Sequence, residues 1–560
     1  MSNNLYEKQA NSLRFLCADM VQKASSGHPG APMGLSEVLT VLSEHIQIDP
    51  TDVKWLNRDR LVFSGGHASS LLYSMLHLWG YDISLDDLKN FRQLGSKTPG
   101  HPEYGLTTAV EITTGPLGQG VANAVGFAMA SKYAKKSLNT KTIDVINHQI
   151  YCLCGDGDLQ EGISYEALST AGKHRLSNLT IIYDSNDITI EGDVKLAWDE
   201  DIKKRFEAIG FDVLIIDGHN FAKIDDSLNR AKNSDNPTII VAKTKIGKGA
   251  ITMEGSSKTH GSPLGEKEIR DSKEKAGFNP DKTFFISSDV RKAFDKTNCL
   301  LSKKWNESLT DDIKKVIDSY TNEDLNNIVY PDFSNTKEIA TRDSNHQILN
   351  SIAKSLPSFI GGSADLAPSN KTDLTNMGDF PNGRNIHFGI KEHSMGAITN
   401  AMNIYGLFRV FSATFFVFSD YMKPACRISA LSNIPQHFIW THDSIGVGED
   451  GATHQPIEQL SQFRAMPNFY TFRPADATNI VSVPCFDLLN EQSQTYIDKI
   501  IDKNTTVIAV EMATAIEYYK YASYVINIDS FGSSGKDVDL FDKYGFTIDK
   551  LKSKIKSIVR

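Results

Sequence analysis

The sequence predicts an α/β protein with two doubly wound domains of mostly parallel strands and a smaller C-terminal α/β domain that is incomplete. One βαβ unit is clear, because apolar runs at 150–154 and 179–183 flank a helical pattern at 164–171. Strand-like runs also alternate with helical patterns along residues 1–260 and again from residue 341. Such alternation is typical of parallel sheets covered by helices.

We place the three domains at residues 1–310, 311–480 and 481–560, and the second ends early, near residue 480. Residues 267–335 are charged and weakly patterned, so we interpret them as a linker that wraps the surface. The tail has a strand-like run at 506–510 and ends in a helical pattern.

The elements of the first domain follow in order. A helix is expected at 5–24, followed by a shaped loop at 25–33, dense in Gly and Pro, that presents His28. A Gly-rich segment at 113–120 leads into a helix at 121–134, and such a helix start is a natural anion site. Further strands are expected at 60–64, 212–216 and 238–242, and further helices at 35–44 and 68–78.

The second domain repeats the alternation. Its strands are expected at 359–362, 385–388, 408–411 and 437–440, with helices at 395–405 and 417–431.

Composition narrows the class of protein. Of the 560 residues 40% are hydrophobic, with 39 glycines, and the net charge is −9 without a long basic tract, which argues against nucleic acid as a partner. Apolar runs of about 18 residues are absent, so no membrane span is expected. The start lacks the regions of a signal peptide, and six scattered cysteines fit a reduced cytosol, so we expect a cytoplasmic protein.

The βαβ unit carries Gly155-Asp156-Gly157, with Asn186 after 28 intervening residues, 158–185. Its crossover places Asp156 and Asn186 at the carboxyl ends of two parallel strands, the edge where open α/β sheets bind ligands. Their oxygens suit Mg²⁺ or Ca²⁺, and the glycines let a diphosphate come close. The alternative is a surface turn with a solvated Asp.

Several histidines lie in Gly- or Pro-rich loops: His28, His67, His101, His260, His442 and His454. They lack metal-ligand spacing, so a hydrogen-bonding and proton-transfer cluster is the better interpretation. Any one of them alone is more commonly a structural or surface histidine.

Two features of the second domain leave alternatives open. Glu392 is either a solvated acid at a helix start or a buried carboxyl that keeps a proton to donate. Phe415, Phe418 and Tyr421 are either plain core or a platform for a heteroaromatic ring.

Five segments together resemble the transketolase family of thiamine diphosphate enzymes, and the resemblance runs from about residue 5 to about residue 478. The segments are Ser26–Gly34, Gly115–Gly118, Gly155–Gly157, Gly361–Asn370 and Gly448–Pro456.

The resemblance implies a role for each matching position. Thiamine diphosphate would lie against His67, Gly115, Pro116, Leu117, Gly157, Asp365, Glu392, Phe415, Phe418 and Tyr421. The metal, Mg²⁺ with Ca²⁺ or another divalent cation as a substitute, would be held by Asp156, Asn186 and the carbonyl of Ile188. Substrate would contact His28, His101, His260, Arg342, Ser369, His442, Asp450 and His454.

The implied reaction is the reversible transfer of a two-carbon ketol unit from a ketose phosphate to an aldose phosphate, in the non-oxidative pentose phosphate pathway. The cofactor supplies a carbanion, Glu392 stabilises the imino tautomer of its aminopyrimidine, and His28, His260 and His442 shuttle protons. The family also implies a homodimer with active sites at the subunit interface. The alternatives are another thiamine diphosphate enzyme, such as a 1-deoxyxylulose-5-phosphate synthase, or a shortened non-catalytic paralogue.

The resemblance breaks near Ile480, where several tens of residues are missing, among them a strand and an arginine expected at the substrate phosphate. A disordered stretch left out of the sequence, a protein shortened on purpose and a deletion in the gene would each explain the break. We favour the first, because a covalent deletion would cut through a sheet.

Overall fold

The computed structural model describes residues 3–333, 338–474, 485–501 and 506–559. The break near Ile480 lies outside these residues. The chain forms two compact units: unit 1 is Met1–Glu323 with Phe380–Asn382 and Ala397–Arg409, and unit 2 is Asp324–Asp379 with Gly383–Gly396 and Val410–Arg560.

Unit 1 is built on a five-stranded sheet in the order β1-β2-β3-β5-β4, and all its neighbouring strands are parallel. The near-continuous apolar sequences of β2 and β3 suit strands that are buried on both faces. The strands are Arg60–Phe63 (β1), Ile150–Gly155 (β2), Leu179–Ser185 (β3), Asp212–Asp217 (β4) and Thr238–Lys243 (β5).

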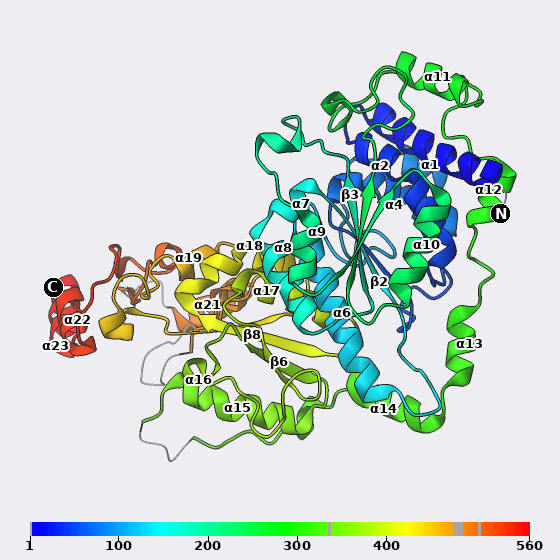
Figure 1. Ribbon diagram of the computed structural model, residues 1–560. Coiled ribbons are helices and arrows are strands. Elements are labelled where there is room, and N and C mark those ends of the chain that lie inside the picture. Colours follow the sequence, from blue (N-terminus) through cyan, green and yellow to red (C-terminus); the bar gives the residue numbers. More distant parts are fainter. Residues whose placement is uncertain (1–2, 334–337, 475–484, 502–505, 560) are drawn as a thin grey trace. The chain divides into compact units, whose positions relative to one another are not determined.

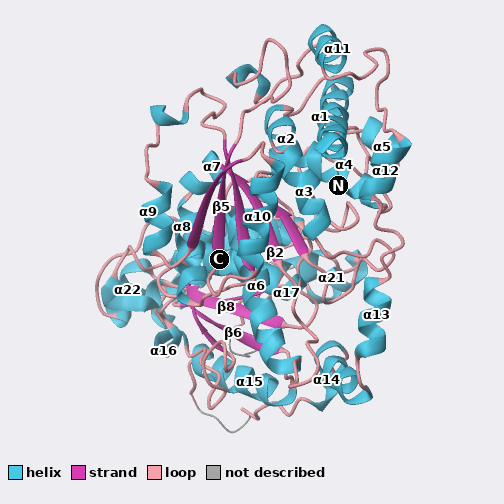
Figure 2. Ribbon diagram, turned by 45° about the vertical axis from the view of Figure 1, so that its right-hand side comes forward, coloured by secondary structure: helices cyan, strands magenta, loops and turns pink. Residues whose placement is uncertain are grey.

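Helices cover both faces of this sheet (Figures 1 and 2). Alternate side chains of β2 point to opposite faces, so Tyr151 and Leu153 join the large core formed with α1, α3, α4 and α10. Cys152 and Cys154 point to the face that α6 covers. The helices are Asn3–Ala24 (α1), Ser36–His45 (α3), Ser69–Trp79 (α4), Gln119–Leu138 (α6), Gly162–Lys173 (α8), Ile202–Ala208 (α9) and Phe221–Lys232 (α10).

Short helices modify two predictions. The segment 25–33, expected to be loop throughout, contains the start of a helix, Gly30–Gly34 (α2). Pro32 is tolerated there because the first turn of a helix has no intrahelical partner for its N–H groups. A helix that we did not predict, Asp156–Gln160 (α7), begins directly at the Gly-Asp-Gly motif, and Leu85–Lys89 (α5) is a further short helix.

The predicted linker is helical and mostly exposed, but two of its helices are anchored in the core of unit 1. Val290 and Phe294 are fully buried, and the buried Lys273 donates to Asp19 at 2.7 Å. Its helices are Glu266–Lys275 (α11), Ser288–Phe294 (α12), Leu301–Ser308 (α13) and Asp311–Thr321 (α14).

Unit 2 holds a four-stranded sheet in the order β7-β6-β8-β9, in which β6 and β7, and also β8 and β9, pair in parallel. The strands are Phe359–Ser363 (β6), Asn385–His387 (β7), Arg409–Phe415 (β8) and His437–Thr441 (β9). The helices are Thr341–Ser355 (α15), Ala367–Asn370 (α16), Glu392–Ile404 (α17), Ser419–Leu431 (α18) and Gln459–Arg464 (α19).

The tail of unit 2 forms the small α/β element that the sequence predicts, with β10 and β11 paired in parallel. Its core joins Ile526, Ile528 and Leu540 to Ile445 and Ile457, so the tail packs against the segment that follows β9. The elements are Phe486–Asn490 (α20), Gln494–Ile500 (α21), Ile508–Val510 (β10), Tyr524–Ile526 (β11), Asp537–Tyr544 (α22) and Ile548–Val559 (α23).

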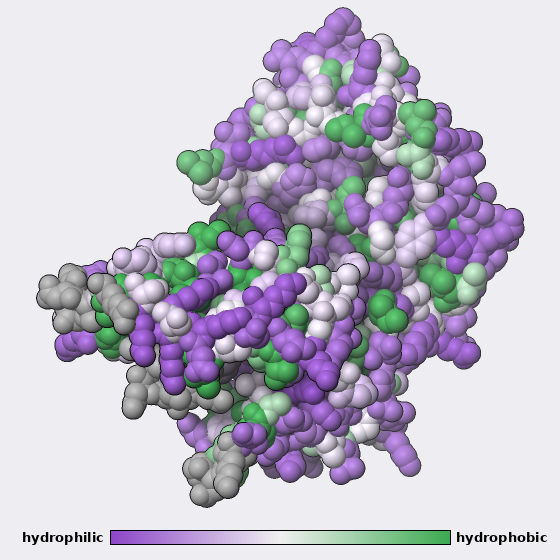
Figure 3. Space-filling view, turned by 90° about the vertical axis from the view of Figure 1, so that its left-hand side faces the viewer, coloured by the Kyte–Doolittle hydropathy of each residue, from purple (hydrophilic) through white to green (hydrophobic). Residues whose placement is uncertain are grey.

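Hydrophilic residues predominate on the face drawn in Figure 3, with hydrophobic residues between them in small groups. Among the described residues, no helix is both long and apolar enough to cross a membrane. All six cysteines are free thiols.

Candidate functional site

Three loops meet at the carboxyl edge of the sheet in unit 1. The first begins at Ser64 after β1 and carries His67, the second is the junction where β2 ends at Gly155 and α7 begins at Asp156, and the third is the segment 113–118. Their glycines permit close contact: a Cβ atom on Gly157 would lie 2.8 Å from Leu117 Cδ1, and one on Gly66 would lie 2.8 Å from Gly115 N. A side chain at Gly66 would push two backbone segments apart, whereas one at Gly157 would meet the flexible end of Leu117.

The loop 113–118 also needs glycine for its backbone conformation. Gly115 has φ +144° and Gly118 has φ +77°, a region that other residues rarely adopt. Gly118 is the N-cap of α6, so the loop turns directly into that helix. Thr114 Oγ1 donates to Phe63 O at 2.7 Å and holds the loop against β1.

The surroundings of Asp156 suit a ligand of a cation. The residue is 4% exposed, its Oδ1 accepts from the hydroxyl of Tyr183, and its buried Oδ2 has no hydrogen-bond partner among the described residues. Burial, helped by the charges of Asp184 and Asp187, raises the pKa of Asp156 to about 7. A divalent cation on Oδ2 would offset that burial, so this oxygen fits a metal ligand.

Asn186 directly follows β3, the strand next to β2. Gly155 of β2 pairs with Asp184 of β3, so Asp156 and Asn186 come just after the paired ends of the two strands. Its Nδ2 donates to Asp184 Oδ2 at 2.8 Å, which fixes the amide, and its Oδ1 accepts from Ile188 N at 3.0 Å. Oδ1 keeps a second lone pair for a cation. The described residues contain no cluster of three or more His, Cys, Asp or Glu side chains suited to a metal, so amide and carbonyl oxygens would complete this site.

Four histidines predicted for the site lie together in unit 1. The His28 ring centroid is 5.4 Å from that of His67, 6.1 Å from that of His101 and 5.8 Å from that of His260. His67 stacks on His260 at 5.4 Å. Burial lowers the pKa of His67 to about 3, and burial together with the charge of Arg92 lowers that of His28 to about 4. The pKa values of His101 and His260 are also lowered, mainly by burial.

These histidines are therefore neutral near pH 7, and each can donate through one ring nitrogen and accept through the other. Such a group can bind hydroxyls and exchange protons with them.

Arg92 contacts the histidine cluster, although the sequence did not indicate it as a site residue. Its Nη2 lies 3.3 Å from His28 Nδ1 and its Nη1 donates to Ser26 Oγ at 3.0 Å. Because a guanidinium can only donate, the contact leaves the proton of a neutral His28 on Nε2. Arg92 sits in a loop with φ +62°, and no local pattern in the sequence indicates that contact.

In unit 2, Glu392 is the first residue of α17 and is 9% exposed. Its burial favours the second of the two interpretations given above, the carboxyl held away from water. Asp365, in contrast, is exposed just beyond the end of β6, at φ +61°.

The aromatic residues form a row at the end of β8. Phe415 stacks on Phe418 with centroids 5.9 Å apart, and Phe418 lies 6.1 Å from Tyr421, which is 65% exposed. One face of Phe415 is covered by His442 at 3.7 Å. The row runs from the buried Phe415 to the exposed Tyr421.

His442 is held by neighbours from three segments. Its Nε2 lies 3.3 Å from Arg342 Nη1, and its Nδ1 lies 2.8 Å from Thr441 Oγ1, which donates to Asn370 Oδ1 at 2.6 Å. This pattern assigns the proton of a neutral ring to Nδ1. Burial and the charge of Arg342 lower the pKa of His442.

The remaining predicted substrate residues lie around His442. Arg342 Nη1 also donates to the carbonyl of Ser369 at 3.4 Å. His454 meets Phe418 edge to face at 5.3 Å. The exposed Asp450 is close enough for its charge to raise the pKa of His442, against the larger effect of burial. The predicted residues thus gather in two groups, one in each unit.

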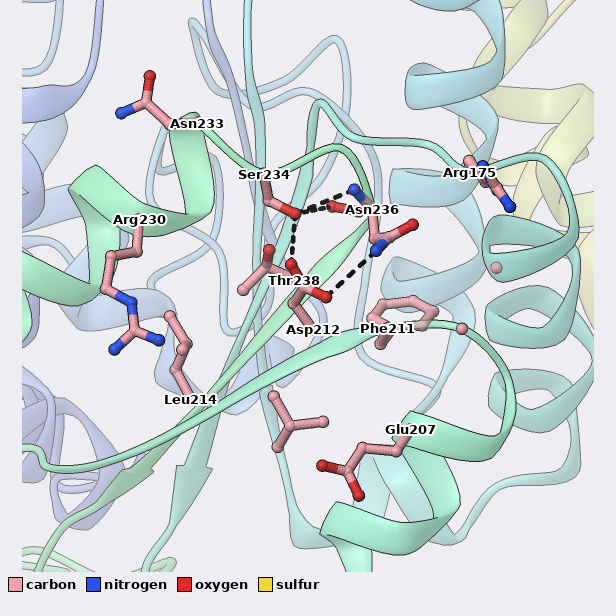
Figure 4. A pocket seen from close by; sticks show the side chains of 13 residues that line it. Arg175, Glu207, Phe211, Asp212, Leu214, Arg230, Asn233, Ser234, Asn236 and Thr238 are labelled. Atoms are coloured by element: carbon pink, nitrogen blue, oxygen red, sulfur yellow. Dashed lines mark hydrogen bonds between the residues drawn. The ribbon is translucent and has the colours of Figure 1, made fainter.

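A cavity of about 800 Å³ opens at the amino ends of β4 and β5, opposite the candidate site (Figure 4). Its Asp212 accepts from Ser234 Oγ at 2.7 Å and from Asn236 Nδ2 at 3.2 Å. None of the residues predicted for the site lines it. Ligands of open α/β sheets bind at the carboxyl ends of the strands, so we place the site there.

Comparison with known families and proteins identifies three matching regions. Residues 5–328 match the transketolase thiamine diphosphate binding domain, residues 337–483 the transketolase pyrimidine binding domain, and residues 475–547 the transketolase-like C-terminal domain. The second and third matches overlap at 475–483, close to the break that the sequence predicts.

Individual relatives agree with these matches over their full length. A transketolase of Bacillus subtilis is 36% identical over 665 aligned residues, covering 100% of both chains. Solved structures of transketolases from Campylobacter jejuni (51% identity, TM-score 0.96, 100% of each chain) and Leishmania mexicana (34%, 0.94, 97% of this chain and 96% of that one) share the fold. The Bacillus alignment has about 105 positions without a residue of this chain (665 − 560).

Proposed function

This chain belongs to the transketolase family, and we propose that the two groups of residues described above form its cofactor and substrate sites. It is a transferase that moves a two-carbon ketol unit reversibly from a ketose phosphate to an aldose phosphate. Neither a different thiamine diphosphate enzyme nor a non-catalytic paralogue is favoured, because the relatives named above are transketolases over their full length.

Thiamine diphosphate supplies the carbanion chemistry when it is bound. In unit 1, the backbone of Gly115–Leu117, Gly157 and the ring of His67 would receive its diphosphate. Asp156, Asn186 and the carbonyl of Ile188 would hold Mg²⁺ or a substitute such as Ca²⁺ against it. The observation that carries this assignment is the buried Oδ2 of Asp156, which has no hydrogen-bond partner in the part of the chain that the structure describes.

In unit 2, Glu392 would share a proton with N1′ of the aminopyrimidine ring. A carboxyl that is 9% exposed suits that role, because it is held away from bulk water. Phe415, Phe418 and Tyr421 would support the ring, and Asp365 would lie near the thiazolium side.

Neutral histidines would bind the substrate and exchange protons with it. His28, His101, His260 and His442 can bind hydroxyls and pass protons in both directions, as a reversible transfer requires. Arg342, with Ser369 and His454, would bind the sugar phosphate, because a guanidinium offers a fork of donors to an anion. Asp450 would accept from a substrate hydroxyl.

We infer a cytoplasmic homodimer whose active sites lie at the subunit interface. The six free thiols are consistent with a reducing compartment. The dimer is inferred from the family, in which the metal side and the glutamate come from different subunits.

A coupled assay with xylulose 5-phosphate and ribose 5-phosphate, with and without thiamine diphosphate and Mg²⁺, tests this proposal. We expect activity that requires the cofactor, and loss of at least about 100-fold in Glu392→Ala, the lower end of general acid–base effects. Pyruvate offered as donor should release no CO₂. Near-normal turnover by Glu392→Ala would refute its role in proton transfer.

A further inference from the structure

Asp158 lies two residues beyond Asp156, in the short helix α7, and its side chain is completely buried. One carboxylate accepts three hydrogen bonds there. Ser64 Oγ donates to Oδ1 at 2.6 Å, Gly118 N donates to the same oxygen at 2.9 Å, and Gly155 N donates to Oδ2 at 2.9 Å.

The three donors lie at the ends of the three loops of the candidate site. Ser64 is the first residue after β1, directly before Gly65, Gly66 and His67, and Gly118 closes the loop 113–118. Gly155 is the residue before Asp156. The network continues into the first turns of α6, because Ser64 Oγ accepts from Val121 N at 3.1 Å. Loops that are far apart in the sequence are thus joined at a single buried side chain.

The three hydrogen bonds at position 158 require a carboxylate as their acceptor. Hydrogen bonds to an ionised acceptor are roughly twice as strong as neutral ones, and a carboxylate offers acceptors on both oxygens. An Asn side chain has nearly the same shape but only one acceptor oxygen, so its NH₂ group would face a donor. In Asp158→Asn, either Gly155 N or the pair Ser64 Oγ and Gly118 N would lose its acceptor.

We infer that Asp158 is a positioning residue that fixes the three diphosphate-facing loops relative to one another, so that cofactor affinity depends on a side chain that does not touch the cofactor. The inference rests on the proposed cofactor site. It follows from geometry, because the close approach of the glycine backbones leaves the loops little room to compensate for a shift.

The test is the dissociation constant of thiamine diphosphate, measured by calorimetry at saturating Mg²⁺ for the full-length wild type, Asp158→Asn and Ser64→Ala. Loss of an outer partner in a metal site typically costs about 10- to 100-fold in affinity, so we expect a rise of that size in Asp158→Asn. Ser64→Ala removes one donor and keeps the carboxylate, so its rise should be smaller. At saturating cofactor, kcat should recover to within a few-fold of the wild-type value.

Asp59→Asn is the matched control. Asp59 is also a buried carboxylate, and it accepts from Gln47 N and Gln149 N at 2.8 Å each, but at the amino edge of the same sheet. We expect this variant to lower Tm without changing the cofactor dissociation constant. The inference would be overturned if the dissociation constant of thiamine diphosphate rose equally in Asp158→Asn and Asp59→Asn. It would also be overturned if that constant stayed at the wild-type value in both Asp158→Asn and Ser64→Ala. Failure of the wild type itself to bind the cofactor would instead refute the proposed function.

Discussion

Gly66→Ala tests whether the contact between two cofactor loops is as tight as the structure indicates. The added Cβ would lie 2.8 Å from Gly115 N and 2.9 Å from the carbonyl carbon of Thr114. Ordinary contacts of a Cβ begin at 3.4 Å, so the two backbone segments must separate by about 0.5–0.6 Å. Neither atom belongs to a flexible side chain that could move away. Gly66 is not among the residues with positive φ, so backbone strain does not confuse the result.

The expected size of the effect follows from overpacking, which typically costs about 1–3 kcal/mol. Cofactor binding should require the native separation of the loops, so this strain opposes binding. At about 1.4 kcal/mol per factor of ten, the dissociation constant of thiamine diphosphate should rise by about 5- to 140-fold.

The assay is calorimetric titration with thiamine diphosphate at saturating Mg²⁺, with Tm measured in parallel. Gly162→Ala is the control: it begins α8, and a Cβ there would meet no described atom within 4 Å. We expect the control to bind the cofactor like the wild type. Wild-type affinity and Tm in Gly66→Ala would show that the loops are not in close contact.

Three other predictions concern stability and length. The pKa values of His28 and His67 are lowered to about 4 and 3 in the folded state, so below about pH 6.5 the unfolded state binds protons that the folded state does not. Tm should therefore fall as the pH drops below about 6.5, and His67→Asn should lessen that fall. Lys273→Met leaves Asp19 as an unpaired buried charge, which should cost about 3–5 kcal/mol in urea unfolding with cofactor affinity unchanged. If a stretch near Ile480 is left out of the sequence, the intact mass should be well above 62.0 kDa, and a mass of 62.0 kDa would refute that explanation.

Much of the fold could be predicted because local patterns determine it. The apolar runs of β2 and β3 and the helical pattern of α8 are continuous in the sequence, and the pairing of Gly155 with Asp184 follows from the βαβ connection. Asp156 and Asn186 therefore follow two neighbouring parallel strands at their carboxyl ends, as the sequence predicted.

Other parts of the site depend on contacts between distant segments. Arg92 reaches His28 across 64 residues, and Asp158 meets Ser64 across 94, so neither contact leaves a periodic signal. The helix α2 was missed because two prolines and two glycines argue against a helix, although one of those prolines is harmless in a first turn. The positive φ of His442, +56°, is likewise fixed by its tertiary partners.

In the proposed homodimer, the Asp156 group of one subunit and the Glu392 group of the other complete one cofactor site. Subunits carrying Asp156→Ala and Glu392→Ala, each with a different affinity tag, can be co-expressed and the mixed dimer purified over both tags. One of its two sites would then combine an intact Asp156 with an intact Glu392. The account predicts about half of the wild-type ketol transfer from a mixture of two inactive variants. A mixed dimer as inactive as its parents would contradict it.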